Sequence, residues 1–463
     1  MIRALCLGWL VLLIALQGCS RPVPDPDTSN ELVVSVPYGP ATYYLDAEGK
    51  PAGYTYDVVQ AFAAKHNWTV KWNETETYFE LFEGLREQES HLVAANLISA
   101  SVDELQLLPG PMLFETRVVV VTRYPIPKIR NLADLAKLNI AVALGAGHIS
   151  LLESARRKYP KLKWTIVEDT FPEGLLARLD EREFDAVVVN EQDFDLARNQ
   201  YPSLRIAYEL SKQKPVVWAL PHGVSKPLLA KLNRFFIEAR RDGTLQKLYE
   251  RHYGHVKRLE PAHAEGILER RLSILPRYRK FFHEAQEQTS LDWRLLGAIG
   301  YQESKWDPYA TSPTGVRGLM MLTGETADRM GISDRLDARQ SILGGAKYLV
   351  LLKDTLPERI PEPDRTWLAL AAYNQGIGHL EDARRIAHAK GMNPDSWADV
   401  KQTLPLLARG GFEKFTKYGY ARGGEAVIFV ESIRSYYDIL LRLEPEHKPL
   451  LMGQGSRGKL ALN

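Results

Sequence analysis

The chain has 463 residues, of which 45% are hydrophobic and 25% are charged, and its formal net charge is +2. A chain of this length is too long for a single hydrophobic core, so we expect two or three domains. The ordinary apolar content is typical of soluble globular domains. The near balance of acidic and basic residues argues against a nucleic-acid-binding protein.

The N-terminus is predicted to be a targeting segment. The apolar run from Ala4 to Leu16 is short for a bilayer span but has the length of the apolar part of a signal peptide. It ends in Leu16-Gln17-Gly18-Cys19, which resembles a bacterial lipobox. The resemblance implies removal of residues 1–18 and lipidation of Cys19; the alternative is an ordinary signal peptide with a chance cysteine. Ser20 then favours the periplasmic face of the outer membrane as the destination.

Both cysteines of the chain, Cys6 and Cys19, lie in this segment. Cys6 would leave with the signal peptide and Cys19 would carry lipid. We therefore expect no structural disulfide in the mature chain, even in an oxidising periplasm. Residues 19–30, which contain three prolines and few apolar side chains, are predicted to be a tether.

Strand and helix patterns alternate over residues 31–256. The β-branched, apolar runs Glu31–Val36 and Ile140–Leu144 are typical of buried strands, and Lys226–Arg241 has the pattern of a helix. This alternation predicts an α/β architecture. A second lobe is expected to begin after Pro127.

Several pieces of this region occur in an order that resembles the family 3 bacterial extracellular solute-binding proteins. They are Gly53–Asp57, Gly145 at a predicted helix start, Phe184–Ala186 and Asn233–Tyr249. The resemblance implies two lobes joined by crossover strands, with a ligand held in the cleft between them. Asp57, Gly145 and His148 are the residues predicted to line that cleft. The backbone N–H groups of 145–148 could hold an anionic group, or Gly145 could serve only as a tight turn.

One departure from that family bears on the ligand. Its amino-acid binders carry an arginine, in Thr-x-x-Arg, that grips the ligand carboxylate in a bidentate manner. The corresponding run here, Ala94–Glu104, has no arginine, and Asp103 or a neighbour would face the carboxylate instead. We therefore expect that this module does not bind free amino acids tightly.

From Leu275 onward the sequence has helical periodicity and no strong strand signal. It predicts a connector over residues 257–270, an all-α domain over 271–446 and a flexible tail over 447–463. Glu303 is the leading catalytic candidate, at the end of an apolar helix that Ser290 is expected to cap. On a helix, Glu303 lies above Ile299 on the apolar face, so its side chain should face packed protein. The alternative is that Glu303 is a solvated surface charge.

The string that follows Glu303 resembles the signature of the lytic transglycosylases of the soluble-lytic-transglycosylase type, a goose-lysozyme-like family. That signature is E-S-x-[FW]-x-P-x-A-x-S-P-x-G-x-x-G-L-M-Q-[LIM]. The matching residues are Glu303-Ser304, Trp306, Pro308, Ala310, Ser312-Pro313, Gly315 and Gly318-Leu319-Met320, with Met321 where the family usually has Gln. Gly318 is expected to let the backbone approach a ligand closely.

Two further motifs of that family are present. Trp367–Gly376 contains A-x-x-A-Y-N-x-G, which implies that Tyr373 and Asn374 line a sugar groove together with Ser312 and Met320. The alternatives are core packing for Tyr373 and helix capping for Asn374. Tyr418–Val430 resembles the E-T-x-x-Y-V helix but has Phe429 at the tyrosine. A role that needs this hydroxyl would be lost, or would move to Tyr418 or Tyr420.

The resemblance implies cleavage of peptidoglycan glycan strands without metal or cofactor. Glu303 would protonate the oxygen between N-acetylmuramic acid and N-acetylglucosamine and then take the proton of the C6 hydroxyl, which closes a 1,6-anhydro ring. For this the glutamate pKa should rise from ~4.3 toward ~6 or above by desolvation. An ordinary glycosidase needs a second carboxylate, for which Asp307 and Glu325 are candidates. No H-E-x-x-H or Cys/His metal-ligand pattern occurs in the sequence.

The whole chain is therefore predicted to be a periplasmic lipoprotein with two modules. A solute-binding-like module, with a muropeptide as the favoured ligand, would regulate or position an all-α, lysozyme-like lytic transglycosylase. The alternatives are a hydrolytic muramidase of the lysozyme type and a cell-wall sensor or solute receptor whose catalytic domain is vestigial.

Overall fold

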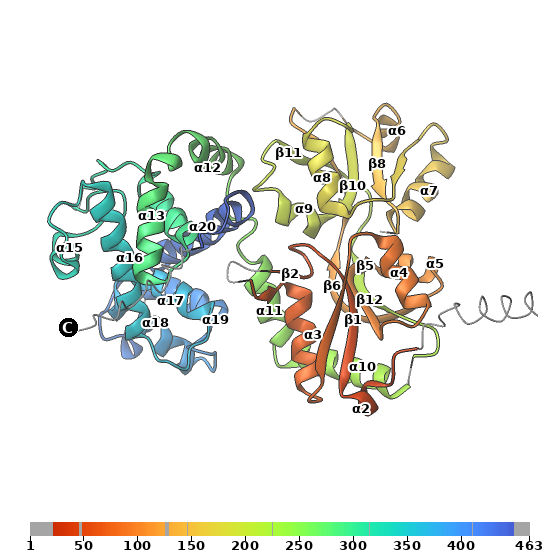
Figure 1. Cartoon of the computed structure of the whole chain (residues 1–463), viewed down its shortest axis with the longest axis horizontal. Helices are drawn as coiled ribbons and strands as arrows, with labels where there is room; N and C mark the ends of the chain where they lie inside the picture. The colour runs from red at the N-terminus through yellow and green to blue at the C-terminus, as the bar shows by residue number, and fades with distance from the viewer. Residues whose placement is uncertain are drawn as a thin grey trace, which may run out of the picture. The chain divides into compact units, whose positions relative to one another are not determined.

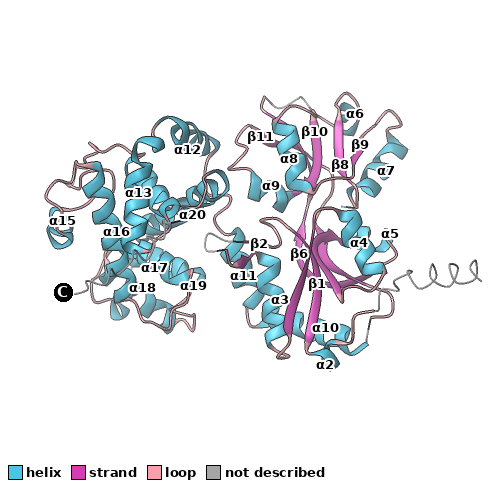
Figure 2. Cartoon of the chain, in the orientation of Figure 1, coloured by secondary structure: helices cyan, strands magenta, loops and turns pink. Residues whose placement is uncertain are grey.

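The structure, a computed structural model, describes residues 22–45, 49–125, 129–145, 147–224, 226–313, 315–409 and 411–448. The chain divides into two compact units, which meet in the sequence at Tyr253 and Gly254. The first unit is α/β and the second is helical (Figures 1 and 2), as the sequence predicts. The lipobox with Cys19 lies outside the described residues.

The described part of the α/β unit has a five-stranded sheet in each of two lobes. The order in lobe one is β4-β1-β5-β12-β6, with the strands Thr69–Thr75, Glu31–Pro37, Leu92–Ile98, Lys214–Leu220 and Leu108–Thr116. The order in lobe two is β11-β7-β10-β8-β9, with the strands Leu204–Glu209, Val118–Arg123, Ala186–Asn190, Ile140–Ala143 and Thr165–Val167. The short β2 and β3 span Tyr44–Leu45 and Pro51–Ala52.

Helices cover both faces of these sheets, which is why the strands read as continuous apolar runs. On lobe one, α3 and α4 lie on opposite sides of β1 and β5 (Figure 1). The helices of this unit are α2 Pro26–Ser29, α3 Tyr54–Ala64, α4 Tyr78–Arg86, α5 Ser99–Glu104, α6 Leu132–Leu135, α7 His148–Lys158, α8 Pro172–Asp180, α9 Glu191–Ala197, α10 Lys226–Arg241 and α11 Thr244–Tyr253.

The chain crosses between the lobes at two places. It enters lobe two at Arg117, between β6 and β7, and returns between β11 and β12. Lobe two therefore begins before Pro127, because β7 continues almost directly from β6 and the prolines follow it. Arg117 donates to the carboxylate of Glu191, at 2.6 Å, and also pairs with Glu209. These ion pairs hold the two crossover segments together.

Part of the segment predicted to be a tether is docked on lobe one. The Val23 amide donates to the Gln88 carbonyl at 2.9 Å, and the Pro24 carbonyl lies 2.8 Å from Nε2 of His91. Asp27, in α2, forms an ion pair with Lys231 of α10. The described chain is thus attached to the α/β unit from its first residues.

The helical unit surrounds one large apolar core, in which α14 packs against α13, α16 and α20. Its α-helices are α12 Pro261–Ser273, α13 Leu275–Thr289, α14 Trp293–Ser304, α15 Gly324–Met330, α16 Ala338–Thr355, α17 Asp364–Gln375, α18 Ile377–Ala389, α19 Trp397–Thr403 and α20 Gly423–Leu443. Two 3-10 helices, η1 Leu404–Ala408 and η2 Glu413–Phe415, precede α20.

The segment expected to be a connector is largely helical. It contributes α12, whose Ala264 and Ile267 are buried in the core of the helical unit. The predicted cap of α14 is wrong: Asp292 caps it, accepting from the Arg294 amide at 2.7 Å. Ser290 instead has left-handed backbone geometry and ends α13.

Candidate active site

Glu303 lies in the last turn of a helix that is otherwise inside the core. Every residue of α14 from Trp293 to Tyr301 is buried, because its apolar side chains face neighbouring helices on all sides. The Glu303 side chain is only partly exposed. A carboxyl group is therefore carried to the edge of an apolar core by the most buried helix of the unit.

The Glu303 carboxyl has no hydrogen-bond or ion-pair partner among the described residues. Burial raises its pKa to about 8, and the nearby Lys305 ammonium opposes that rise. Desolvation disfavours the charged form of a carboxyl group, so Glu303 keeps its proton at neutral pH. This is the state that a general acid requires.

The loop after Glu303 is fixed by contacts to the core. The Ser304 hydroxyl donates to the Leu319 carbonyl at 2.8 Å, and the Trp306 indole N–H donates to the Gly297 carbonyl at 2.8 Å. Gly318 has φ +87°, and a Cβ there would lie 1.8 Å from the Arg335 carbonyl oxygen. The close approach at Gly318 is therefore to the chain's own backbone, not to a ligand as the sequence predicts.

Tyr373 and Met320 lie together beside this carboxyl. The Tyr373 hydroxyl donates to the Met320 carbonyl at 2.9 Å. Burial, and then the charge of Glu303, raise the pKa of Tyr373 well above its ordinary value. The Met320 side chain is fully buried, so a substrate could contact this residue only through its backbone.

The other two predicted groove residues are positioned by turns. Asn374 is exposed near the C-terminal end of α17, which Gly376 caps with φ +87°. Its side chain makes no capping hydrogen bond within the described residues and so remains available to a ligand. The Ser312 hydroxyl accepts a hydrogen bond from the Val316 amide at 3.3 Å, which places it in the loop after Glu303.

Neither candidate second carboxylate is coupled to Glu303. Asp307 is exposed, and its side chain accepts from the Tyr309 amide at 2.9 Å. Glu325 is an exposed residue in the first turn of α15. Within the described residues, burial and Lys305 account for the pKa shift of Glu303. The site thus presents a single unpaired carboxyl group.

Phe429 stands where the family motif has a tyrosine, and it makes an apolar contact there. It is buried, and its ring stacks on that of Tyr373 at 6.4 Å between centroids. Tyr418 and Tyr420 are both exposed. The Tyr418 ring instead packs over Gly378, where a Cβ would lie 2.8 Å away.

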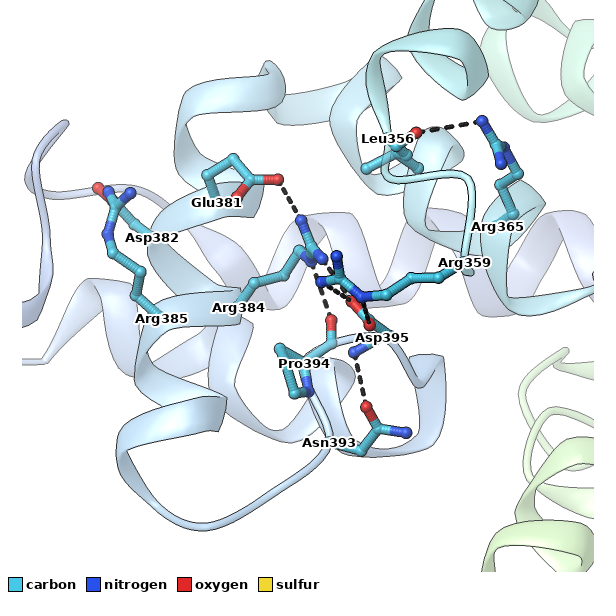
Figure 3. Close-up of polar contacts among 10 residues, drawn as sticks. All are labelled: Leu356, Arg359, Arg365, Glu381, Asp382, Arg384, Arg385, Asn393, Pro394 and Asp395. Carbon is cyan, nitrogen blue, oxygen red and sulfur yellow. Dashed lines mark hydrogen bonds and ion pairs between the residues drawn. The ribbon is translucent and has the colours of Figure 1, made fainter. Parts of the chain in front are cut away.

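An ion-pair cluster that sequence reasoning missed supports α18, the helix after Asn374 (Figure 3). Arg384 of α18 bonds Glu381 at 2.5 Å and donates to the Pro394 carbonyl at 2.9 Å. It also pairs with Asp395, which Arg359 contacts at 2.6 Å. Arg359 is 36 positions from Asp395, so the fold brings this second arginine to the cluster, whereas Glu381 is one helical turn from Arg384.

The residues predicted for the cleft of the α/β unit do not all meet. Gly145 lies against Tyr78 and Phe82 of lobe one. His148 is fully buried, 3.0 Å from the Asn190 side chain, and burial lowers its pKa to about 4. Asp57 instead pairs with His252 of α11 at 2.8 Å. No contact among the described residues joins it to the other two.

Sequence reasoning missed the acidic residue beside His148. The Asp193 carboxylate of α9 accepts from the side-chain NH2 of Asn190 at 3.0 Å, and burial raises the pKa of Asp193 to about 7. Asn190 ends β10, so its position after a strand was the available signal. Asp103, which the sequence predicts to face a ligand carboxylate, is exposed on α5.

No described helix is long and apolar enough to cross a membrane. The described part of the chain has no group of three or more His, Cys, Asp or Glu side chains that could hold a metal ion.

Comparisons with known proteins agree with the two-unit architecture. Residues 31–255 match the family described as "Bacterial extracellular solute-binding proteins, family 3", and residues 280–395 match "Transglycosylase SLT domain". Among solved structures, an ancestral arginine-binding protein bound to arginine is 23% identical, with a TM-score of 0.44, over 48% of this chain and 98% of its own.

Full-length relatives carry one common name, "Membrane-bound lytic murein transglycosylase F". The relative from Thiobacillus denitrificans is 55% identical, over 97% of this chain and 96% of its own length. Those from Nitrosospira multiformis and Methylobacillus flagellatus are 44% and 41% identical, over 95% of this chain and 92% and 94% of their own lengths. The chain therefore belongs to the membrane-bound lytic murein transglycosylase F family.

Proposed function

We propose that this lytic murein transglycosylase cleaves the β-1,4 bond between N-acetylmuramic acid and N-acetylglucosamine, with Glu303 as both acid and base. The observation that carries the proposal is an unpaired carboxyl, at the edge of the helical core, whose pKa is raised to about 8 by burial. Such a group holds a proton at neutral pH and can give it to a poor leaving group.

The reaction has two proton transfers. Glu303 gives its proton to the glycosidic oxygen as the C1–O bond breaks, so N-acetylglucosamine leaves with a hydroxyl group and C1 becomes electron-poor. The Glu303 carboxylate then removes the proton of the C6 hydroxyl while O6 bonds to C1 of the same muramic acid. The 1,6-anhydro ring closes, Glu303 regains its proton and no water is consumed.

The neighbours of Glu303 fit this scheme better than hydrolysis. A hydrolase with the usual pair of carboxylates needs a second one across the bond, and Asp307 and Glu325 are both exposed. We assign Asn374, with Ser312, Tyr373 and the Met320 backbone, to the binding of the glycan strand. Intact Glu303, Tyr373 and Asn374 also argue against a vestigial catalytic domain.

Substitution of Glu303 tests the mechanism. Glu303→Gln keeps the shape but removes the transferable proton, so activity on insoluble peptidoglycan should fall by more than ~10²–10⁴-fold, the usual cost of losing general acid catalysis. Asp307→Asn and Glu325→Gln are matched controls that should retain most activity. Mass spectrometry of the wild-type products should find anhydro ends, one water lighter than reducing ends. Reducing ends as the main product would refute the single-carboxyl mechanism.

We further propose that the α/β unit binds a wall fragment, a muropeptide, and regulates or positions catalysis. The support is the lack of an arginine in Ala94–Glu104 and the polar group formed by His148, Asn190 and Asp193. Asp193 is a partly exposed acidic residue, not a cation that could bind a carboxylate.

Calorimetry tests this ligand assignment. With the intact protein carrying Glu303→Gln, so that glycan is not consumed, muropeptides should give a binding signal and common amino acids should not. Asp193→Asn should weaken muropeptide binding if the Asp193 carboxyl contacts the ligand. Micromolar binding of any common amino acid would overturn the assignment.

The remaining proposal concerns location. We assign the mature protein to the periplasm, attached by lipid on Cys19 to the outer membrane. The support is the lipobox-like sequence Leu16–Cys19 and the name of the relatives, which describes them as membrane-bound.

A further inference from the structure

Lys305, two positions after Glu303, is a lysine without an acidic partner. Its side chain is partly buried, and within the described residues it forms no ion pair. Its ammonium lies 4.5 Å from the ring centroid of Tyr301 and 5.2 Å from that of Tyr436. The faces of two tyrosines attract a cation. They offset part of the cost of removing an ammonium group from water.

The backbone of Lys305 is also held in place. Lys305 and Trp306 have φ values of +56° and +61°, a left-handed conformation that costs free energy for residues other than glycine. The Lys305 amide donates to the Tyr301 carbonyl at 2.9 Å, and Arg270 of α12 donates to the Lys305 carbonyl at 3.0 Å. Since only one residue separates Lys305 from Glu303, their Cα atoms lie within about 7 Å.

Few other charges act on this pair. Burial, and then the charge of Arg270, lower the pKa of Lys305 to about 8, whereas the charge of Glu303 raises it. The described titratable and charged groups that act on the pair come from four helices: Tyr301 and Tyr436 face the ammonium, Tyr373 lies beside the carboxyl and Arg270 acts on Lys305. The tyrosines are neutral at the pH of catalysis.

We propose that Lys305 is a positioning residue for Glu303: its ammonium, held by Tyr301 and Tyr436, keeps a positive charge beside the carboxyl and stabilises the carboxylate between the two proton transfers. This inference rests on the proposed role of Glu303 as acid and base. The charge of Lys305 would make the single carboxyl of Glu303 sufficient for both proton transfers.

The chemical reason lies in the intermediate state. After the first transfer, the leaving group holds the proton and Glu303 is a buried carboxylate. Without a nearby cation, burial would make that carboxylate so unfavourable that Glu303 would hold its proton too tightly to be an effective acid. Because Lys305 lowers the pKa of Glu303, removing its charge should raise that pKa further.

The test is the pH dependence of kcat for Lys305→Met and Lys305→Arg. Activity is lost at alkaline pH as Glu303 loses its proton, and this loss forms the alkaline limb of the pH profile of kcat. Lys305→Met should move that limb to higher pH by about one unit. It should also lower kcat at neutral pH several-fold. Lys305→Arg should leave the limb in place. The matched control is Lys280→Met, since Lys280 is an exposed lysine 4.8 Å from the Phe281 ring centroid.

An unmoved limb in a folded, less active Lys305→Met variant would mean that Lys305 has only a structural role, and would overturn the proposal. A measurement that needs no charge-removing variant at Lys305 is NMR of lysines reductively methylated with ¹³C, which keeps their charge. The resonance that is missing in Lys305→Arg should titrate near 8 and move down in Glu303→Gln; no response would also overturn the proposal. An active Glu303→Gln variant would instead refute the proposed function itself.

Discussion

At the residue scale, the candidate site depends on the position of Glu303, just after the buried part of α14 ends. Glu303 follows nine consecutive buried residues of α14, from Trp293 to Tyr301. Its pKa is therefore set mainly by the helix that carries it and not by a neighbouring carboxylate. The turn after Glu303 should tolerate few substitutions, because the Trp306 indole N–H is bonded to the Gly297 carbonyl of the buried helix.

Tyr373→Phe tests the contact that supports this turn from α17. It removes the hydroxyl that donates to the Met320 carbonyl at 2.9 Å but keeps the ring that stacks on Phe429. The unfolding free energy should fall by about 1–3 kcal/mol, because a buried carbonyl loses its donor. Activity should fall too, since Tyr373 lies beside Glu303. Thermal unfolding and peptidoglycan turnover measure the two effects.

Tyr348→Phe is the matched control for that variant, because Tyr348 packs on Tyr373 at 5.2 Å between ring centroids but makes no bond to Met320. It should retain turnover close to that of the wild type. Equal losses in both variants would mean that the Tyr373 hydroxyl has no special role.

At this scale, sequence reasoning could single out Glu303 as a candidate because its signature is local. Its match extends through Ser312 to Met320, all within one loop. It could not show that the Met320 side chain is buried or that Tyr373 bonds the Met320 carbonyl, because that contact joins residues 53 positions apart. Asp193 and the Arg384–Asp395 pair were missed for a different reason: their partners are near in the sequence, but sequence reasoning took no account of polar residues that follow a strand or a helix.

At the element scale, α12 is part of the catalytic unit. Its Arg270 donates to the Lys305 carbonyl, and Gly266 faces the Tyr301 hydroxyl, where a Cβ would lie 2.8 Å away. Sequence reasoning took this segment for a connector, because it lies between the α/β pattern and the helical periodicity that begins at Leu275. Tertiary packing of Ala264 and Ile267 instead makes it part of the helical unit.

Two truncated chains test the role of α12. A chain that begins at residue 254 keeps the whole helical unit and should cleave peptidoglycan. A chain that begins at residue 274 lacks α12 and should lose most of its activity, because the turn after Glu303 loses the Arg270 bond. Circular dichroism separates loss of this contact from loss of the fold.

Arg270→Met in the intact chain is the finer control, since it removes that bond and leaves the helix in place. Its activity should lie between those of the two truncated chains. Full activity of the chain that begins at residue 274 would show that α12 is dispensable.

At the scale of the whole molecule, the sequence predicted both architectures correctly, the α/β unit and the all-α unit. Alternating strands and helices give way to helical periodicity alone, and this change is visible without any structure. The place where the chain first crosses into lobe two was not visible, because β6 continues almost directly into β7 through Arg117. Only the pairing of β7 with β10 and β11 assigns it to lobe two.

Cys19→Ala tests attachment to the membrane. Without a thiol the chain cannot be acylated, and anchoring requires acyl chains, so the variant should be found free in the periplasm. Labelled palmitate should enter the wild type and not the variant. Absence of label from both would refute lipidation.

The docking of Val23 and Pro24 on lobe one limits the reach of an acylated enzyme. Only Ser20 and Arg21 would separate the lipidated Cys19 from residue 22, a span of roughly 10 Å when fully extended. A free coil of the twelve residues 19–30 would sample end-to-end distances near 20 Å. With so short a linker, the depth of cell wall that an acylated enzyme can reach depends mainly on the size of its folded units. Inserting residues between Cys19 and residue 22 should increase that depth.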